Sequence, residues 1–539
     1  MRPSALIVPA LLILAEVPAG AQSSSSAVVW QRWEQSLTSS QSYSNPYADV
    51  ALSVTYSGPG GRTIRASGFW DGGNTFRIRC AFPAAGTWTW TTSCSDPSNS
   101  GLHQKSGTVS VSSYSGTNPL YKRGFLKVSP DRRHLVFADG TPFLWMGDTA
   151  WAAPLKASLA DWQAYVDDRA AKHFSVIQIS PASAWAGSTD AAGNAPFLGS
   201  GLAQGNPPYW QGFEEKVEYA NQKGIVILLV GIMEPVTRYP ASAEACLFAR
   251  HIAARLHGNH VIFSPSFDSL YRTLGDDVGN ALDAATEVHL VTQHVGTNLD
   301  AARSYYDKGY LDFSGCQSGH NGGNREKCAS NAINWNLDLY RRSPCKPVVN
   351  LEAFYDANGT TAGMHAKYQG TAKDARQLGY LSWLSGSLGY TYGAHGLWNW
   401  QTDSSKGYAW SKAMQYPSST QMKHMRDFFA GIEWWRLEPA HGLVLNQPPT
   451  WLQRMVLARS AGGDLAVAYL PDNASIQIDM TAFPTAMSGR WYSPVQGSFT
   501  EIPDPIPNTG AFTLNRPGSG DWVLLLKAVS SPSPPGRPQ

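Results

Sequence analysis

Between about residues 120 and 430 the chain alternates short apolar, β-branched runs with longer segments of helical periodicity. The eight strand candidates are 143–148, 176–180, 225–232, 261–268, 289–295, 312–317, 348–352 and 389–397. Helical patterns lie between them, for example at 159–172, 210–223, 242–257, 325–341 and 372–386. Such alternation predicts a parallel sheet covered by helices. Eight units favour a closed (β/α)₈ barrel, a TIM barrel. A doubly wound open sheet is disfavoured because its glycine-rich phosphate loop is missing after the first strand.

Short strands with two-residue alternation lie on both sides of this region. They occur at 50–56, 75–80 and 87–92, and again at 465–470, 476–480 and 522–526. The first group fits the spacing of an immunoglobulin-like sandwich. The sequence therefore predicts a multidomain protein in which a TIM barrel is flanked by two β-sandwiches. The predicted units are a signal peptide (1–21), a sandwich (22–116), the barrel (117–433), a second sandwich (434–529) and a disordered tail (530–539).

The first 21 residues have the pattern of a secretory signal. Arg2 precedes an apolar stretch at 5–15, and Ala19-Gly20-Ala21 provides a small-residue cleavage site. The apolar stretch is too short to span a bilayer. Secretion would permit disulfides among the six cysteines, and Cys80 with Cys94, close in sequence, is the pair we expect.

The charge and the aromatic content of the chain limit the classes of partner that it can bind. The net charge is +2 with 15% charged residues, which provides no basic field for nucleic acid. The 20 Trp and 23 Tyr supply flat apolar surfaces that stack on sugar rings, although most of the Trp would fill sandwich cores. No cysteine has metal-ligand spacing, so we expect no metal and no other cofactor. A carbohydrate is the predicted partner, with neither nucleic acid nor membrane, and no pattern predicts an oligomeric state.

Two of the predicted barrel strands end on a carboxylate. Asp268 ends the fourth strand and Glu352 ends the seventh. The carboxyl ends of barrel strands meet at one rim, where the chemistry of such barrels takes place. Cleavage of a glycosidic bond needs one carboxylic acid and one carboxylate on opposite sides of that bond. Each residue also has a structural interpretation, Asp268 as a helix N-cap and Glu352 as the partner of a rim arginine. Their joint placement favours catalysis.

Further polar and aromatic residues follow the other strands, and we expect them to bind sugar hydroxyls or stack on sugar faces. They are Asp148, Trp151, Gln178, Glu234, His294, Gln317, His320, Trp398 and Trp400. Asp148 equally fits a role in holding its loop together. For His294 and His320, orienting a catalytic group is at least as good an interpretation as direct catalysis.

Several blocks in this region resemble the apiosidase-like glycoside hydrolase family. They are DGTPFLWMGDTAW (139–151), FSVIQ (174–178), TQH (292–294), LDF (311–313), QSGH (317–320) and YGAHGLWNW (392–400). GFWDG (68–72) and FPAAGTW (82–88) resemble the sandwich that often precedes such barrels, and the C-terminal module resembles a collagen-binding-type module of related chains. In that family an Asp after the fourth strand, preceded by two glycines, is the acid/base, and a Glu after the seventh strand is the nucleophile. Asp268 and Glu352 match these positions, but Ser266-Phe267 replaces the glycines and Asn350-Leu351 replaces Asp-Gly. These departures predict a reshaped sugar subsite.

The resemblance implies a retaining glycoside hydrolase that cleaves a furanoside bond in a plant or microbial polysaccharide, and the signal-peptide pattern predicts that it is secreted. Asp268 would be the general acid/base and Glu352 the nucleophile. Two alternatives are a catalytically silent carbohydrate-binding or adhesion protein and a polysaccharide lyase. The presence of both carboxylates disfavours the first. The lack of an evident Lys or Arg cluster at the strand ends disfavours the second, because a lyase must neutralise a uronate carboxylate.

Overall fold

The computed structural model describes residues 23–233, 240–320, 323–357 and 369–529. The predicted signal peptide, Glu234 and the predicted tail lie outside the described residues. Within the described ranges, no helix has the length and apolar character needed to cross a membrane.

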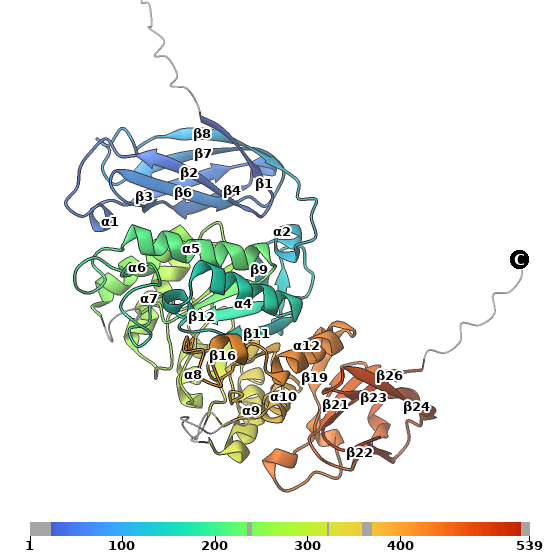
Figure 1. The fold of residues 1–539 in the computed structure, drawn as a ribbon. Coiled ribbons are helices and arrows are strands. Elements are labelled where there is room, and N and C mark those ends of the chain that lie inside the picture. Colours follow the sequence, from blue (N-terminus) through green and yellow to red (C-terminus); the bar gives the residue numbers. More distant parts are fainter. Residues whose placement is uncertain (1–22, 234–239, 321–322, 358–368, 530–539) are drawn as a thin grey trace, which may run out of the picture.

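Eight parallel strands form the centre of the molecule (Figure 1). They are β11 (Trp145–Thr149), β12 (Val176–Ile179), β13 (Val226–Val230), β14 (Val261–Ser264), β15 (Leu290–Val291), β16 (Ser314–Gln317), β17 (Val348–Glu352) and β18 (Gly389–Thr391). The sheet order is β15-β14-β13-β12-β11-β18-β17-β16, so the two edge strands are consecutive in the chain. The N–H of Asp312 donates to the Val291 carbonyl at 2.9 Å, and the Thr292 hydroxyl donates to the Phe313 carbonyl at 2.8 Å. These bonds join the two edges, and the predicted TIM barrel is confirmed.

Helices surround this barrel, and polar side chains mark where several of them begin. The longer ones are α4 (Leu159–Ala171), α5 (Pro207–Gln222), α6 (Ser242–Arg255), α7 (Thr273–Ala285), α8 (Leu299–Tyr306), α9 (Arg325–Tyr340), α10 (Ala372–Trp383) and α12 (Pro417–Ala430). Helix α4 begins after Ser158, whose hydroxyl accepts from the N–H of Asp161 at 3.1 Å. Thr371 and Asp374 form a reciprocal capping box at the start of α10.

Strand side chains point alternately into the barrel and toward the helices, as the two-residue period of a strand requires. Trp145, Val176 and Val349 belong to the interior cluster, whereas Met146 and Ile177 pack in the cluster shared with the helices. This alternation fixes which residues of a strand can reach the inside of the rim.

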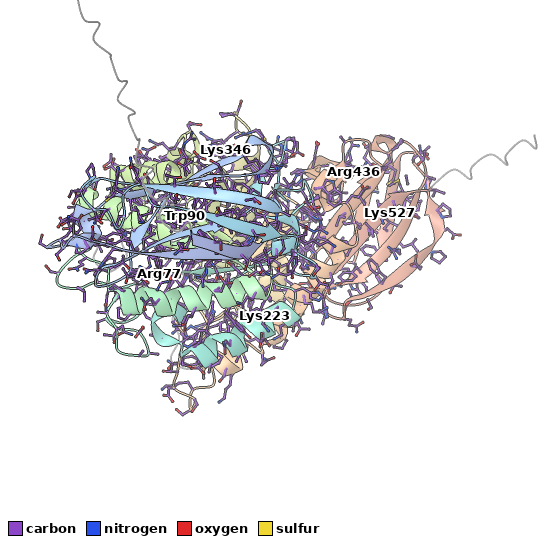
Figure 2. The ribbon with its side chains drawn as sticks, turned by 90° about the horizontal axis from the view of Figure 1, so that it is seen from above. Arg77, Trp90, Lys223, Lys346, Arg436 and Lys527 are labelled. Carbon is purple, nitrogen blue, oxygen red and sulfur yellow. The ribbon has the colours of Figure 1, made fainter. Side chains whose placement is uncertain are left out.

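The N-terminal domain is a sandwich of two antiparallel-rich sheets. One sheet has the order β1-β8-β7-β3-β4 and the other β2-β6-β5. The bounds are β1 (Ser23–Val28), β2 (Arg32–Thr38), β3 (Leu52–Ser57), β4 (Thr63–Ser67), β5 (Phe69–Trp70), β6 (Thr75–Ala81), β7 (Gly86–Cys94) and β8 (Ser106–Ser112). Trp33, Trp88 and Trp90 fill its core. The domain lies over the barrel helices α5 and α6, and Figure 2, which labels Trp90, shows it from above.

The predicted Cys80–Cys94 disulfide is wrong, because all six cysteines are free thiols. Cys80 lies in β6 and Cys94 ends β7. These strands are consecutive in the chain, but they belong to different sheets of the sandwich and do not form one hairpin. Sheets pack about 10 Å apart, whereas a disulfide needs Cα atoms within about 7 Å.

The C-terminal domain packs a six-stranded antiparallel sheet, β19-β20-β21-β26-β23-β24, against the pair β22-β25. The bounds are β19 (Leu437–Pro439), β20 (Val456–Ser460), β21 (Leu465–Leu470), β22 (Ser475–Asp479), β23 (Met487–Ser493), β24 (Ser498–Ile506), β25 (Ala511–Asn515) and β26 (Trp522–Ala528). Arg376 of α10 forms a two-point ion pair with Asp521 at 2.7 and 3.1 Å. The domain therefore docks on the barrel through a buried charge pair.

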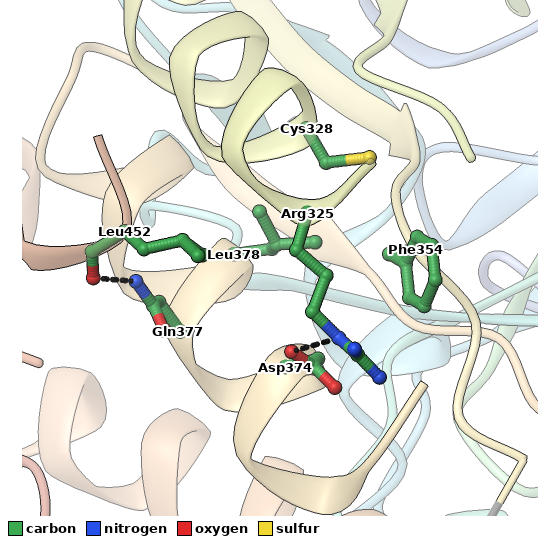
Figure 3. Close-up of a pocket in the computed structure, with 7 residues that line it drawn as sticks. All are labelled: Arg325, Cys328, Phe354, Asp374, Gln377, Leu378 and Leu452. Atoms are coloured by element: carbon green, nitrogen blue, oxygen red, sulfur yellow. Dashed lines mark hydrogen bonds and ion pairs between the residues drawn. The ribbon is translucent and has the colours of Figure 1, made fainter. Parts of the chain in front are cut away.

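A small cavity marks the same junction (Figure 3). Gln377 of α10 donates to the carbonyl of Leu452 at 2.6 Å, and Arg325 of α9 pairs with Asp374 at 2.9 Å. Phe354, two residues beyond the end of β17, lines the cavity on the other side of Arg325. The C-terminal domain thus contacts the helices that follow the sixth and seventh barrel strands. The exact boundaries of the three domains stay predictions.

Candidate active site

The two predicted catalytic carboxylates lie together at the carboxyl-end rim of the barrel. Glu352 is the last residue of β17, and Asp268 lies four residues beyond the end of β14. One oxygen of each carboxylate and one ring nitrogen of His294 all lie within 4.8 Å of one another. Strands β14 and β17 are separated by β15 and β16 on one side of the barrel, so residues of those two strands form the wall between the carboxylates.

The backbone holds Asp268 in an uncommon conformation. Its φ is +48°, in the left-handed region that Asp and Asn tolerate better than other non-glycine residues. The next residue, Ser269, forms a parallel bridge with Val295, and its carbonyl accepts from the N–H of Gly296 at 3.2 Å. The side chain of Asp268 is 50% exposed, so a substrate can reach it from solvent.

Glu352 differs from Asp268 in being buried, with 3% of its surface exposed. Nε2 of His320 lies 2.7 Å from its Oε1, which is hydrogen-bond distance. The pairing of β16 with β17 shifts register between Cys316 and Gln317, and this irregularity sets Gln317 opposite Glu352. Register shifts of this kind re-aim side chains near active sites. Gln317 is 4% exposed, and its Oε1 has no hydrogen-bond partner among the described residues.

His294 lies between the two carboxylates. Its Nδ1 is 3.8 Å from Asp268 and its Nε2 is 3.5 Å from Glu352. Burial lowers the pKa of His294 to about 3, so the imidazole is neutral at neutral pH. Neither ring nitrogen has a hydrogen-bond partner within the described part of the chain. Because buried polar groups are nearly always hydrogen-bonded, these nitrogens mark a place for a ligand hydroxyl.

Asp268, His294 and Glu352 together also form a group that could hold a metal ion. Carboxylate and imidazole donors suit several divalent cations. The ring, however, turns Nδ1 toward one carboxylate and Nε2 toward the other. The imidazole therefore bridges the two carboxylates. This arrangement does not direct the three donor groups at one metal position.

Aromatic rings form the rest of the lining. Trp151 contacts Phe267 at 4.8 Å and His294 at 5.1 Å between ring centroids, and its indole N–H donates to the hydroxyl of Tyr355 at 3.2 Å. Burial, with added repulsion from Glu352 and Asp268, raises the pKa of Tyr355 well above its usual value. Tyr355 was missed as a site residue in the sequence, although it lies three positions after Glu352 and its aromatic ring was a usable signal.

The atypical neighbours Phe267 and Leu351 take different positions. Phe267 is partly buried and its ring faces Trp151 and His294. Leu351 is fully buried in the barrel interior, and a side chain at Gly315 on the adjacent strand would collide with it. Phe267 therefore lines the site, whereas Leu351 lies beneath it.

The remaining predicted residues divide into two groups. Gln178 lies inside the barrel, where its amide donates to Thr149 at 2.8 Å and to the Leu351 carbonyl at 2.9 Å, and Trp398 contacts Tyr355 at 6.4 Å. These residues lie below and beside the site. Glu234 lies outside the described residues.

The structure places Asp148 and Trp400 away from Asp268 and Glu352. Strand alternation turns Asp148 outward, where it pairs with Arg169 at 2.8 Å and accepts from Tyr165 at 2.8 Å, both on α4. Trp400 is fully buried and stacks on Trp410 at 4.7 Å. Both residues attach the barrel to its outer layer.

Comparison with known families and structures agrees with this architecture. Residues 129–436 match the apiosidase-like catalytic domain, residues 26–95 match a domain of unknown function, and residues 439–527 match a collagen-binding-like domain. A search of curated proteins found no match.

Solved structures share the fold at low sequence identity. A glycoside hydrolase family 5 structure from Bacteroides vulgatus ATCC 8482 has a TM-score of 0.67 at 20% identity and covers 77% of this chain and 95% of that chain. A structure described as a glycoside hydrolase has a TM-score of 0.66 at 20% identity, with 78% and 100% covered. Another structure from the same Bacteroides strain, with a TM-score of 0.68 at 17% identity, covers 94% and 100%. Since the family match spans more than half of the sequence, this chain belongs to the apiosidase-like family of glycoside hydrolase-like proteins.

Proposed function

We propose that this protein is a secreted, retaining glycoside hydrolase that acts on a furanoside bond of a plant or microbial polysaccharide. The observation that carries the proposal is the proximity of Asp268 and Glu352: one oxygen of each carboxylate lies within 4.8 Å of one oxygen of the other. Retaining enzymes hold their two carboxyl groups about 5–5.5 Å apart, and inverting enzymes hold them about 6.5–9.5 Å apart to admit a water molecule. The separation supports retention.

In the first step Glu352 attacks the anomeric carbon as a carboxylate while the bond to the leaving oxygen breaks. Protonated Asp268 gives its proton to that oxygen, and a covalent glycosyl–Glu352 ester forms. In the second step Asp268 takes a proton from water as the water oxygen attacks the same carbon. The ester bond breaks, Glu352 returns to the carboxylate, and Asp268 is protonated again.

The surrounding groups suit these roles. His320 contacts Oε1 of Glu352 at 2.7 Å and holds the carboxylate in place. Neutral His294 lies between the two acids, where a ring nitrogen can form a hydrogen bond with a sugar hydroxyl. The half-exposed Asp268 meets the leaving group from the solvent side, whereas Glu352 meets the sugar from the buried side. The furanoside preference rests on the family resemblance. Because Phe267 occupies a position where the family has glycine, apiose is one of several furanosides to test.

The test is hydrolysis of a panel of aryl glycosides, including apioside, arabinofuranoside, galactofuranoside and xyloside, by the wild type and the Glu352→Gln variant. Glutamine keeps the shape of the side chain but cannot act as the nucleophile. We therefore expect the rate of hydrolysis to fall at least roughly thousand-fold while the unfolding temperature stays unchanged. Glu215→Gln, an exposed glutamate on α5, is the control. Proton NMR of the first product formed should show the anomeric configuration of the substrate. An inverted product, or full activity in Glu352→Gln, would refute the assignment.

A further inference from the structure

A large aromatic side chain stands in solvent beside the candidate site. Trp185, on the segment that follows β12, is 49% exposed. Its ring lies 5.7 Å from that of Trp398, between centroids, with planes at 51°. Single exposed apolar residues are common on protein surfaces. Trp185 differs because its neighbour is itself part of an aromatic row that leads to the nucleophile.

That row is continuous. Trp398 contacts Tyr355 at 6.4 Å, and Tyr355 contacts His320 edge-on at 4.5 Å. His320 in turn lies 2.7 Å from Glu352. The rings therefore extend from the buried carboxylate to the solvent-exposed face of Trp185.

The segment that carries Trp185 is anchored at both sides of the ring. The N–H of Ala186 donates to the Ser183 carbonyl at 2.9 Å, and the Tyr209 hydroxyl donates to the carbonyl of Pro181. Ala182 and Ala186 are buried. Trp398 is held as well, because its carbonyl accepts from the N–H of Ala152 at 3.1 Å. The backbone that carries both rings is thus held by hydrogen bonds, and the rings contact each other, so less entropy is lost on binding.

Strand order shows that this pair and the histidines come from different parts of the barrel rim. His294 and His320 follow β15 and β16, which lie between the two catalytic strands on one side. Trp185 and Trp398 follow β12 and β18, which flank β11 on the other side. The histidines and the tryptophan pair therefore belong to the two different arcs of strands that join β14 to β17, and Tyr355 contacts both His320 and Trp398.

We propose that Trp185 and Trp398 form a stacking subsite for a second sugar residue, the one bonded to the reacting sugar in a saccharide chain. The proposal rests on the glycoside hydrolase function proposed above. A sugar ring offers an apolar face of C–H groups and a polar rim, and an aromatic ring binds that face without needing to recognise one particular hydroxyl pattern. Because the row of rings reaches Glu352, the ligand that this pair binds is the same saccharide that reacts at Glu352. The protein then acts on saccharides of two or more units in preference to single glycosides.

The first experiment measures chain-length preference in Trp185→Ala. The readout is kcat/KM on a two-to-five-unit oligosaccharide divided by kcat/KM on the aryl glycoside of the same sugar, using whichever sugar the panel identifies. We expect this ratio to fall about ten-fold, the size of a lost aromatic contact. Trp185→Phe should retain more of the ratio than Trp185→Ala. Leu198→Ala, another exposed apolar residue in the connection between β12 and α5, is the matched control and should keep the ratio. An unchanged ratio in Trp185→Ala overturns the subsite and leaves the hydrolase function standing.

The second experiment measures binding without turnover. Affinity electrophoresis of the Glu352→Gln protein in gels that contain arabinan, xylan or rhamnogalacturonan should show retardation in at least one gel. Adding Trp185→Ala should weaken that retardation about ten-fold in apparent dissociation constant. If the panel shows no hydrolysis but retardation depends on Trp185, the hydrolase proposal fails and the binding subsite stands. If none of the gels retards the protein, the subsite proposal is overturned.

Discussion

Asp268, the proposed acid/base, has a left-handed backbone with φ of +48°. Asn tolerates this conformation better than Ala, so Asp268→Asn removes the proposed proton donor with little added strain. We predict that kcat/KM on an oligosaccharide falls about 10²–10⁴-fold, the usual contribution of general acid–base catalysis. On a dinitrophenyl glycoside, whose leaving group needs no proton, the loss in the glycosylation step should be much smaller. Equal losses on both substrates, measured by steady-state kinetics, would exclude Asp268 as the acid.

Phe267 is the one of the two atypical neighbours whose side chain lines the candidate site. Its ring lies 4.8 Å from Trp151 and 5.8 Å from His294. We predict that Phe267→Gly changes the relative kcat/KM values of the aryl furanosides and xyloside by about 10–200-fold, because a pocket contact is worth about 1–3 kcal/mol. Leu351→Met is the control, since Leu351 lies inside the barrel below the site. Identical relative rates in wild type and Phe267→Gly would show that Phe267 does not line the subsite.

At the scale of whole elements, a buried ion network joins the N-terminal sandwich to the barrel helices. Glu214 of α5 pairs with Arg79 of β6 at 2.7 Å and with Arg255 of α6 at 2.5 Å. Arg255 also pairs with Asp71 at 2.7 Å, and all four side chains are buried. Removing one member of such a network leaves buried charges uncompensated.

Glu214→Gln should therefore lower the free energy of unfolding by about 3–5 kcal/mol. Urea denaturation followed by tryptophan fluorescence measures this change. Its neighbour Glu215 is exposed on the same helix, so Glu215→Gln should change stability by less than about 0.5 kcal/mol. Similar stabilities for the two variants would mean that the network carries no net charge coupling between the domains.

At the scale of the whole molecule, buried neutral histidines link stability to pH. Burial lowers the pKa of His257 and His260 to about 4, and that of His289 and His294 to about 3. The usual value is about 6.5, so between pH 6.5 and about 4 the unfolded chain binds more protons than the folded one. Their contribution to stability is complete above pH 6.5 and is lost progressively as the pH falls.

Each of these histidines should lower the free energy of unfolding by about 2 kcal/mol between pH 6.5 and 5, because one pKa unit corresponds to about 1.4 kcal/mol. We predict that the free energy of unfolding, from urea titrations at pH 7, 6 and 5, falls by several kcal/mol. His289→Gln should remove about 2 kcal/mol of that fall. A stability that is flat between pH 7 and 5 would contradict the neutral state of these histidines.

The sequence by itself determined the alternation of eight strands and helices, and with it the barrel. Period and chain order are local properties, so residues 348–352 were predicted as a strand that ends on Glu352, and β17 has those bounds. The same logic placed Asp268 and Glu352 after the fourth and seventh strands, and the circular order of a barrel brings such ends to one rim. The alternation of side chains along β11 is also a sequence signal for the outward direction of Asp148, because Asp148 shares a strand face with Met146.

Only the tertiary structure decided which distant side chains surround those carboxylates. The contacts of Trp151 with Tyr355, of Trp185 with Trp398 and of His320 with Glu352 join residues on different loops or strands. Their approach depends on barrel curvature and on the paths of long connections, which leave no local pattern. For the same reason Cys80 and Cys94 were paired wrongly: closeness in sequence does not reveal that β6 and β7 enter different sheets. Trp400, adjacent to a rim motif, turns instead to Trp410, because burying two large rings against each other stabilises the fold more than exposing one.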